Sequence, residues 1–176
     1  HAGWYVVGRQ QNSDNSWRAV ITRWKTDGTR DTTFGTDGWM YTSVSGNIEI
    51  VDAAMAGNKM YILTTMVFGG IPIMRVICKD MTTDTNCFPL FGGLATFSAS
   101  TSGPVHSAWA RRILYDSRYG LFVVGKIFTD AHGWEMAVAR LDANTGAHIN
   151  SFGSNGEIHG LPTWGPQSGS VLDVFD

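Results

Sequence analysis

The chain has 176 residues and a formal net charge of −2, with 21 Gly, seven Trp, nine Phe and five Tyr. Lys and Arg are scattered along the chain and form no cluster larger than the pair Arg111-Arg112, so the chain lacks the basic field that binds phosphate backbones and we expect no nucleic-acid partner. No apolar run approaches the ~18 residues that span a bilayer, and we expect no membrane span. Abundant Gly and aromatic residues, with only 16% charged residues, indicate one all-β domain of short strands and tight turns.

The chain opens at His1 without the charged and apolar pattern of a signal peptide. We expect a soluble segment, and this start fits a mature or excised piece of a longer protein.

Three copies of one pattern follow each other at a spacing of roughly 60 residues, which is typical of a repeat protein. The first copy, residues 1–47, contains the strand pattern Trp4-Tyr5-Val6-Val7-Gly8-Arg9, then Trp17-Arg18-Ala19-Val20-Ile21-Thr22-Arg23, then Phe34-Gly35-Thr36-Asp37-Gly38. The last copy, residues 107–169, follows it closely with Leu121-Phe122-Val123-Val124-Gly125-Lys126, Trp134-Glu135-Met136-Ala137-Val138-Ala139-Arg140 and Phe152-Gly153-Ser154-Asn155-Gly156.

The second copy, residues 48–106, is degenerate and contains two cysteines. Cys78 and Cys87 flank a polar stretch, residues 79–86, that is typical of a hairpin loop. Cysteines near a hairpin end can form a disulfide, which would imply an oxidising compartment, or they can stay reduced. Two cysteines without a third or fourth ligand nearby do not predict a metal site.

The third copy shows the strand order most clearly. Apolar runs separated by turn residues predict four strands, at 108–115, 120–127, 134–141 and 149–158. Short connections make neighbouring strands antiparallel, so each copy is predicted to be a four-stranded meander. The first strand of the second copy is predicted at Ile48 to Ala56, and the first copy lacks such a strand. Residues 170–176, Ser170-Val171-Leu172-Asp173-Val174-Phe175-Asp176, resemble the first strand of a next copy or a closing strand.

Four-stranded meanders in series are the blades of a β-propeller, whose ring needs ~4 to 8 blades. Three blades are too few for a closed ring. The chain is therefore a fragment of a longer propeller, or two chains complete a ring, or the meanders form an open stack. The strand at 170–176 could add to Trp4–Arg9 within the chain or in a neighbouring molecule, which would make a homo-oligomer by strand exchange.

The residues quoted above resemble a known family. An aromatic-Val-Val-Gly strand, a strand ending in Arg, an Asp-Gly turn and Asp31-Thr32-Thr33-Phe34-Gly35-Thr36-Asp37-Gly38 are similar to the delta-60 repeat of bacterial surface and secreted proteins. The second copy departs from the pattern, since Cys78 stands at its Arg position. The resemblance implies a propeller-like all-β fold and export to the extracellular space or cell surface, and it implies no catalytic residues.

The repeated residues have structural explanations. Gly tolerates positive φ in a tight turn, and the preceding Phe fills the gap between sheets, which we predict for Phe34, Gly35, Gly38, Phe152, Gly153 and Gly156. Arg23 and Arg140 each end an apolar strand, and we expect each to pair with a carboxylate such as Asp27 or Asp142. The alternative is an arginine that faces a substrate in the central channel.

Candidate binding residues are aromatic. Trp39, Trp134 and Trp164 are the candidates to contact a ligand, and Trp134 alternatively belongs to the core, as Trp17 does at the same position of the first copy. Oxygen-rich turns at Asp14-Asn15 and at Asp27-x-Thr29-x-Asp31 could hold Ca²⁺, but no complete calcium loop is present, and no other cofactor is predicted. The scattered carboxylates nominate no catalytic pair.

These observations favour a non-enzymatic, extracellular binding, adhesion or assembly module of a bacterial surface protein, with a protein or glycan partner. One alternative is a carbohydrate-active enzyme whose site lies at the propeller axis, which a cluster of acidic residues beside aromatics would indicate. A second alternative is a self-associating subunit of a surface filament.

Overall fold

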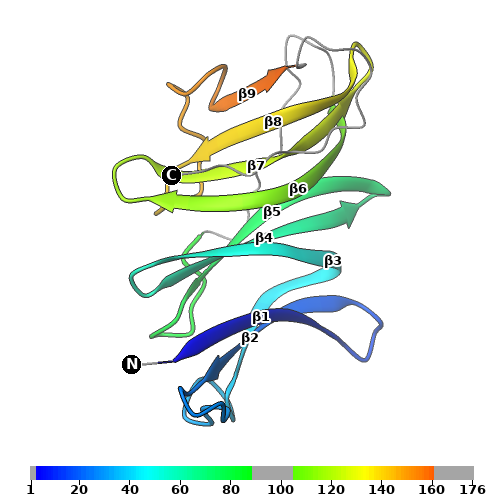
Figure 1. Cartoon of the computed structure of the whole chain (residues 1–176). Coiled ribbons are helices and arrows are strands. Elements are labelled where there is room, and N and C mark those ends of the chain that lie inside the picture. The colour runs from blue at the N-terminus through cyan, green and yellow to red at the C-terminus, as the bar shows by residue number, and fades with distance from the viewer. Residues whose placement is uncertain (1–2, 89–104, 161–176) are drawn as a thin grey trace.

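The computed structural model describes residues 3–88 and 105–160. These ranges form an all-β structure of nine strands, and they contain no helix that is long and apolar enough to cross a membrane. The strands form two antiparallel sheets, one with the order β1-β2-β3-β4-β5 and one with the order β6-β7-β8-β9 (Figure 1). The prediction of an all-β chain of antiparallel strands is confirmed.

The first sheet contains β1 (Trp4–Gln11), β2 (Trp17–Trp24), β3 (Trp39–Ala56), β4 (Lys59–Phe68) and β5 (Ile71–Asp80). The second sheet contains β6 (Val105–Asp116), β7 (Gly120–Thr129), β8 (Gly133–Leu141) and β9 (Glu157–Gly160). Consecutive strands pair because short turns connect them.

The long strand β3 joins two differently oriented parts of the first sheet. Its first half, up to Gly46, pairs with β2, and its second half, from Asn47, pairs with β4. Gly46 has a φ of 150°, and β3 bends sharply in its middle (Figure 1). The predicted boundary between the first two copies, at 47/48, falls next to this bend.

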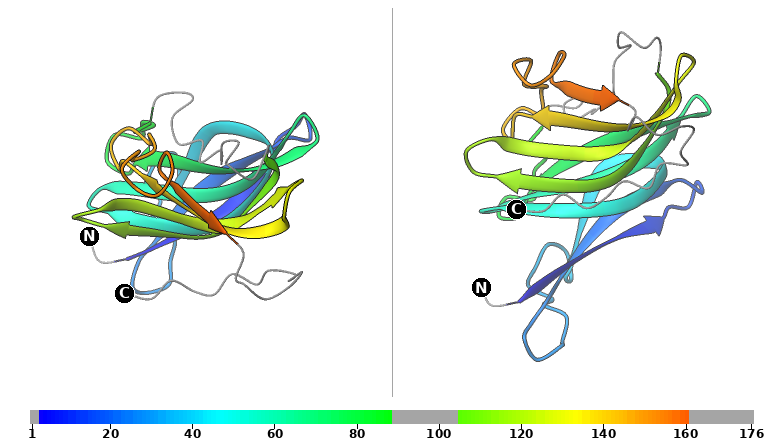
Figure 2. Two further views of the ribbon diagram at one scale, coloured as in Figure 1. Left: turned by 90° about the horizontal axis from the view of Figure 1, so that it is seen from above. Right: turned by 45° about the horizontal axis from the view of Figure 1, so that its top comes forward.

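Three layers therefore stack on each other (Figure 2). We call them the first layer (β1, β2 and the first half of β3), the middle layer (the second half of β3, β4 and β5) and the third layer (β6 to β9). One apolar cluster lies between the first and middle layers and a second between the middle and third layers. Strand β4 supplies both, with Met60 and Ile62 on one face and Tyr61 and Leu63 on the other. Burial on both faces explains its continuous apolar run.

Polar contacts hold β6 against the middle layer. The pairing of β6 with β7 shifts register between Ala110 and Arg112. Around this bulge the backbone N–H of Ala110 donates to Thr65 Oγ1 at 3.1 Å, and the backbone N–H of Ile113 donates to Asp52 Oδ2 at 3.0 Å. The bulge interrupts the backbone hydrogen bonds between β6 and β7, and side chains of the middle layer accept the backbone N–H groups of β6 near it.

The first and third layers repeat the same side-chain contacts. Tyr5 packs edge-on against Phe34 with ring centroids 5.7 Å apart, and Phe122 packs against Phe152 in the same way at 5.7 Å. A cation covers a tryptophan in both layers: Arg9 lies 4.5 Å from the ring centroid of Trp17, and Lys126 lies 4.4 Å from that of Trp134. Equal positions in the two copies therefore make equal contacts.

The Phe-Gly turns also coincide. Gly35 and Gly153 have φ values of 56° and 57°. A Cβ on either would collide with the backbone carbonyl of the first residue of the following strand, Trp39 of β3 or Glu157 of β9. The later glycines of the turns, Gly38 and Gly156, have φ values of 86° and 89°. Positive φ at these positions accounts for the glycines.

The fourth strand of the third copy differs from its prediction. A strand was expected over 149–158, but β9 covers only Glu157–Gly160, and the preceding segment consists of turns. Gly153, Asn155 and Gly156 all have positive φ, which is incompatible with an extended strand. The Phe-Gly step is therefore the turn that leads into β9, as the first copy's step leads into β3.

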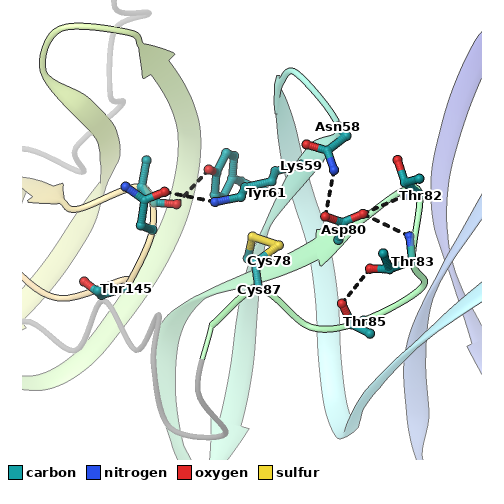
Figure 3. The surroundings of a disulfide bond; sticks show 12 residues. Asn58, Lys59, Tyr61, Cys78, Asp80, Thr82, Thr83, Thr85, Cys87 and Thr145 are labelled. Carbon is teal, nitrogen blue, oxygen red and sulfur yellow. Dashed lines mark hydrogen bonds between the residues drawn. A yellow bond between two sulfur atoms is a disulfide. The ribbon is translucent and has the colours of Figure 1, made fainter.

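A disulfide joins Cys78 and Cys87, as one reading of the sequence predicted (Figure 3). Their Cα atoms are 5.1 Å apart, and the backbone N–H of Cys87 donates to the carbonyl of Cys78 at 3.0 Å. The loop between them is held by Lys79, whose Nζ lies 2.6 Å from Asp84 Oδ1. The bridge thus closes the turn that follows β5.

Candidate ligand-binding site

The strongest candidate site is a cavity where the middle and third layers meet at one end of the strands. The β3–β4 and β6–β7 hairpins both project at this end, on the left in Figure 1. We call the cavity the tyrosine cavity; its volume is about 350 Å³. Three tyrosines, three cations, two asparagines and two aspartates line it: Tyr61, Tyr115, Tyr119, Lys59, Arg118, Arg140, Asn58, Asn144, Asp116 and Asp142.

The tyrosines form the aromatic floor of this cavity. Tyr61 and Tyr115 are stacked, with ring centroids 6.1 Å apart and planes 17° from parallel. Tyr61 is buried, its hydroxyl donates to the carbonyl of Ala143 at 2.8 Å, and burial raises its pKa to about 12. Tyr115 and Tyr119 remain exposed at the opening. The buried Tyr61 ring thus supports Tyr115, and a ligand can reach both Tyr115 and Tyr119.

Cationic side chains frame the tyrosines. Lys59 Nζ donates to Asn144 Oδ1 at 2.9 Å, a contact that crosses from the middle to the third layer (Figure 3). Arg140 Nε donates to the carbonyl of Tyr119 at 2.6 Å, and its guanidinium lies 5.5 Å from the Tyr119 ring centroid. Arg118 lies 5.2 Å from the same centroid. Two guanidinium groups therefore lie close to the Tyr119 ring.

The two aspartates of the cavity accept hydrogen bonds from the backbone of its loops. Asp116 Oδ1 accepts backbone N–H bonds from Arg118 at 2.7 Å and Tyr119 at 3.1 Å. Asp142 Oδ1 accepts them from Asn144 at 2.9 Å and Thr145 at 2.8 Å. These backbone hydrogen bonds lower the pKa of both carboxyl groups, so both are ionised at neutral pH. The aspartates thus preorganise the loops that carry the tyrosines.

A second cavity of about 740 Å³ lies between the first and middle layers. Asn58 lines both cavities, so they open at the same end of the strands. Its walls include Phe34, Gly35 and Met81, with Arg23 at the side. Fewer exposed aromatic rings line this cavity, and we therefore regard the tyrosine cavity as the candidate site.

The two predicted ligand-contact tryptophans that the structure describes, Trp39 and Trp134, lie apart. Trp39 begins β3 at the end of the strands where the cavities lie, and Arg30 covers its ring at 4.9 Å. Trp134 pairs with Phe128 at the opposite end, beside the β7–β8 turn, and its ring packs edge-on against Phe128 at 5.4 Å. Trp164 lies outside the described residues. Trp39 and Trp134 therefore cannot share one binding surface.

The two repeat arginines have different partners. Arg23 forms an ion pair with Asp31, with Nη2 and Oδ2 2.7 Å apart, so the expectation of a carboxylate was right and the choice of Asp27 was wrong. The register explains this, because the backbone N–H of Asp31 bonds to the carbonyl of Arg23 and brings the two side chains together. Arg140 lies beside Asp142 in the cavity wall but donates to the Tyr119 carbonyl.

The oxygen-rich turns that could have held Ca²⁺ satisfy their own backbone. Asp27 Oδ1 accepts bonds from both the backbone N–H and the hydroxyl of Thr29, at 2.8 and 2.7 Å. Asp14 Oδ1 does the same with Ser16, at 2.9 and 2.6 Å. In the ranges 3–88 and 105–160 no group of three or more His, Cys, Asp or Glu side chains is placed to hold a metal ion.

No pattern in the sequence pointed to the three tyrosines as a site. Tyr115 ends one predicted strand, 108–115, and Tyr119 directly precedes the next, 120–127, so two tyrosines beside one short polar turn were the available signal. Tyr61 belongs to an apolar run, and only its place opposite the third layer shows that it stacks on Tyr115. Comparisons with protein-family models, with curated proteins and with solved structures found no match.

Proposed function

We propose that the protein is a non-enzymatic binding module of an exported bacterial repeat protein, and that it binds glycans in the tyrosine cavity. Each layer corresponds to one blade of a propeller-like array of delta-60-type repeats. The disulfide supports export, because such bonds persist in oxidising compartments.

The exposed tyrosines at the mouth of the cavity carry this proposal. Sugar rings have apolar faces that stack on aromatic rings and hydroxyl groups that both donate and accept hydrogen bonds. The cavity offers Tyr115 and Tyr119 for stacking, Asn144 and Lys59 at its rim, and charges of both signs. This balance suits an uncharged polyhydroxyl ligand better than a strongly charged one.

A carbohydrate-active enzyme fits the same cavity less well. Asp116 and Asp142 stand beside aromatic rings, as a glycosidase pair does. A general acid, however, needs a raised pKa, whereas backbone hydrogen bonds lower the pKa of both carboxyl groups here. Binding without hydrolysis is therefore the better supported function.

Isothermal titration with neutral cello-, xylo-, malto- and chito-oligosaccharides tests the proposal. We expect at least one series to bind, and Tyr119→Ala to weaken its binding about tenfold or more, as removal of an interface aromatic commonly does. Trp4→Ala, which removes an exposed ring outside both cavities, is the matched control and keeps the affinity. Absence of binding to all four series, or equal binding by Tyr119→Ala, would refute the glycan site, and release of reducing ends would favour the enzyme.

A further inference from the structure

The second cavity repeats the tyrosine cavity one layer earlier in the chain. Each cavity lies between two successive layers, and the first hairpin of the later layer borders it: β3–β4 in the second cavity and β6–β7 in the tyrosine cavity. The turn after the third strand of the same layer adds to the wall, at 81–84 in the second cavity and at 142–144 in the tyrosine cavity. The repeat therefore forms a similar cavity at each of these two contacts between layers.

The register of the two hairpins shows which side chains match. Met55 pairs with Met60, and Tyr115 pairs with Leu121 at the same place in the repeat. Met55 and Tyr115 therefore hold matching positions, and each lines the cavity of its own hairpin. Their exposed fractions are similar, at 40% and 37%. An exposed, polarisable thioether thus takes the place of an exposed ring.

Both cavities also receive a tyrosine from their earlier layer. Tyr5 of β1 and Tyr61 of β4 hold the same position in the repeat, and each lines the cavity that follows its layer. Tyr5 packs against Phe34 with ring centroids 5.7 Å apart, and Tyr61 packs against Phe88 at 5.8 Å. The same pair of rings therefore supports the wall of each cavity.

The turns of the two walls are folded by matching aspartates. Asp80 Oδ1 accepts the backbone N–H groups of Thr82 and Thr83 at 2.8 and 3.0 Å. Asp142 does the same for Asn144 and the residue after it in the third layer. Thr82 thus takes the place of Asn144, and its exposed side chain lines the second cavity with a hydroxyl group in place of an amide.

The charged side chains of the second cavity are paired. Arg23 lies against Asp31, with Nη2 and Oδ2 2.7 Å apart, and Asp84 Oδ1 lies 2.6 Å from Lys79 Nζ. Apolar side chains and a threonine hydroxyl line the same cavity beside these ion pairs. This combination suits the uncharged polyhydroxyl ligand that the tyrosine cavity also suits.

The β3–β4 turn lies between the two cavities. Asn58 lines both cavities, Met55 lines the second cavity and Lys59 lines the tyrosine cavity. Asn58 Nδ2 donates to Asp80 Oδ2 at 2.7 Å, which holds the turn against the wall of the second cavity (Figure 3). Gly57 and Asn58 are exposed, and a Cβ on Gly57 would meet no described atom within 4 Å. A ligand can therefore pass over this turn from one cavity to the other.

We propose that the second cavity is a further subsite for the glycan, and that one linear chain crosses Gly57 and Asn58 and occupies both cavities. This inference rests on the proposed glycan binding in the tyrosine cavity. Packed sheets lie ~10 Å apart, which is about the length of a disaccharide, so a chain that fills both cavities has at least two disaccharide units. The ligand class is thus a linear, uncharged polysaccharide, and two subsites on one chain raise its affinity.

Isothermal titration with the di-, tetra- and hexasaccharide of the series that binds tests the proposal. We expect one hexasaccharide per protein, bound about tenfold or more tighter than the disaccharide. Met55→Ala and Thr82→Ala, on two walls of the second cavity, should each weaken hexasaccharide binding and leave disaccharide binding unchanged, with a loss of about fivefold or more for Met55→Ala. Tyr119→Ala should weaken binding of both ligands. The unchanged disaccharide affinity also shows that the Met55 and Thr82 variants are folded.

Met136→Ala is the matched control, because it removes a methionine of similar exposure, 45%, that lies outside the walls of both cavities. It should keep both affinities. A hexasaccharide that binds no more tightly than the disaccharide overturns the shared chain, and so does a hexasaccharide affinity that neither Met55→Ala nor Thr82→Ala lowers. In both cases disaccharide binding that is sensitive to Tyr119→Ala still supports the tyrosine cavity. Absence of binding by every series refutes the proposed function, and the second subsite with it.

Discussion

Gly35 and Gly57 have nearly the same backbone conformation, but the fold requires a glycine at the two positions for different reasons. Their φ values are 56° and 59°. Gly35 lies in the turn before β3 and Gly57 directly follows β3, and both line the cavity between the first and middle layers. A Cβ on Gly35 would collide with the carbonyl of Trp39, whereas a Cβ on Gly57 would meet no described atom within 4 Å. Gly57 is therefore needed for its φ alone, and Gly35 for both its φ and the close approach of another backbone segment.

Alanine substitutions should separate these two contributions. We expect Gly57→Ala to reduce the free energy of unfolding by about 1 kcal/mol, the cost of a positive φ for a residue with a Cβ. Gly35→Ala should reduce it by about 3 kcal/mol, because backbone atoms must also move. Urea unfolding of the two variants measures the difference, and equal losses would show that the Phe-Gly turn relaxes freely.

At the scale of elements, the turn after β5 is the place where the second copy departs from the repeat pattern. In the first copy Arg23 pairs with Asp31 across the segment that follows β2. In the second copy Cys78 stands at the arginine position, and a covalent bond to Cys87 takes the place of the ion pair. Both connections hold the chain close to the strand that it has just left.

The double substitution Cys78→Ala with Cys87→Ala tests this role. Closing a loop of this length should stabilise the protein by about 2 to 3 kcal/mol, mainly by restricting the unfolded chain. We expect the double variant to lose this free energy in urea unfolding, together with a smaller loss from the buried Cys78 site. A reducing agent should destabilise the wild type and leave the double variant unchanged; an effect on both would point to another cause.

At the scale of the whole molecule, the middle layer couples the other two. Ile62 and Leu63 are adjacent in β4 and both fully buried, but they belong to different apolar clusters. A layer that is buried on both faces cannot lose one neighbour without exposing apolar surface to water. The three layers should therefore unfold together.

Truncation of either residue tests this coupling. We expect Ile62→Ala and Leu63→Ala each to lower the free energy of unfolding by about 2 to 5 kcal/mol, as core truncations do. Calorimetry should still show one transition with equal calorimetric and van't Hoff enthalpies in both variants. Two separated transitions in either variant would show that an outer layer unfolds independently.

The amino-acid sequence by itself determined the strands and the repeat positions, because these depend on local patterns. Alternating and continuous apolar runs predict β7 and β8 within a few residues of their bounds, and the cysteine spacing predicts a bridge as one of two outcomes. The fourth strand, predicted at 149–158, lies at 157–160, because the positive φ of Asn155 is not visible in the apolar pattern.

Only the tertiary structure decided which side chains meet. Tyr61 and Tyr115 come from different sheets and stack because the third layer packs on the middle one, a contact that no local spacing encodes. Trp39 and Trp134 were both predicted to contact a ligand, and the antiparallel register placed them at opposite ends of the strands. Local backbone preferences act within a few residues, whereas a binding site depends on how distant strands pack.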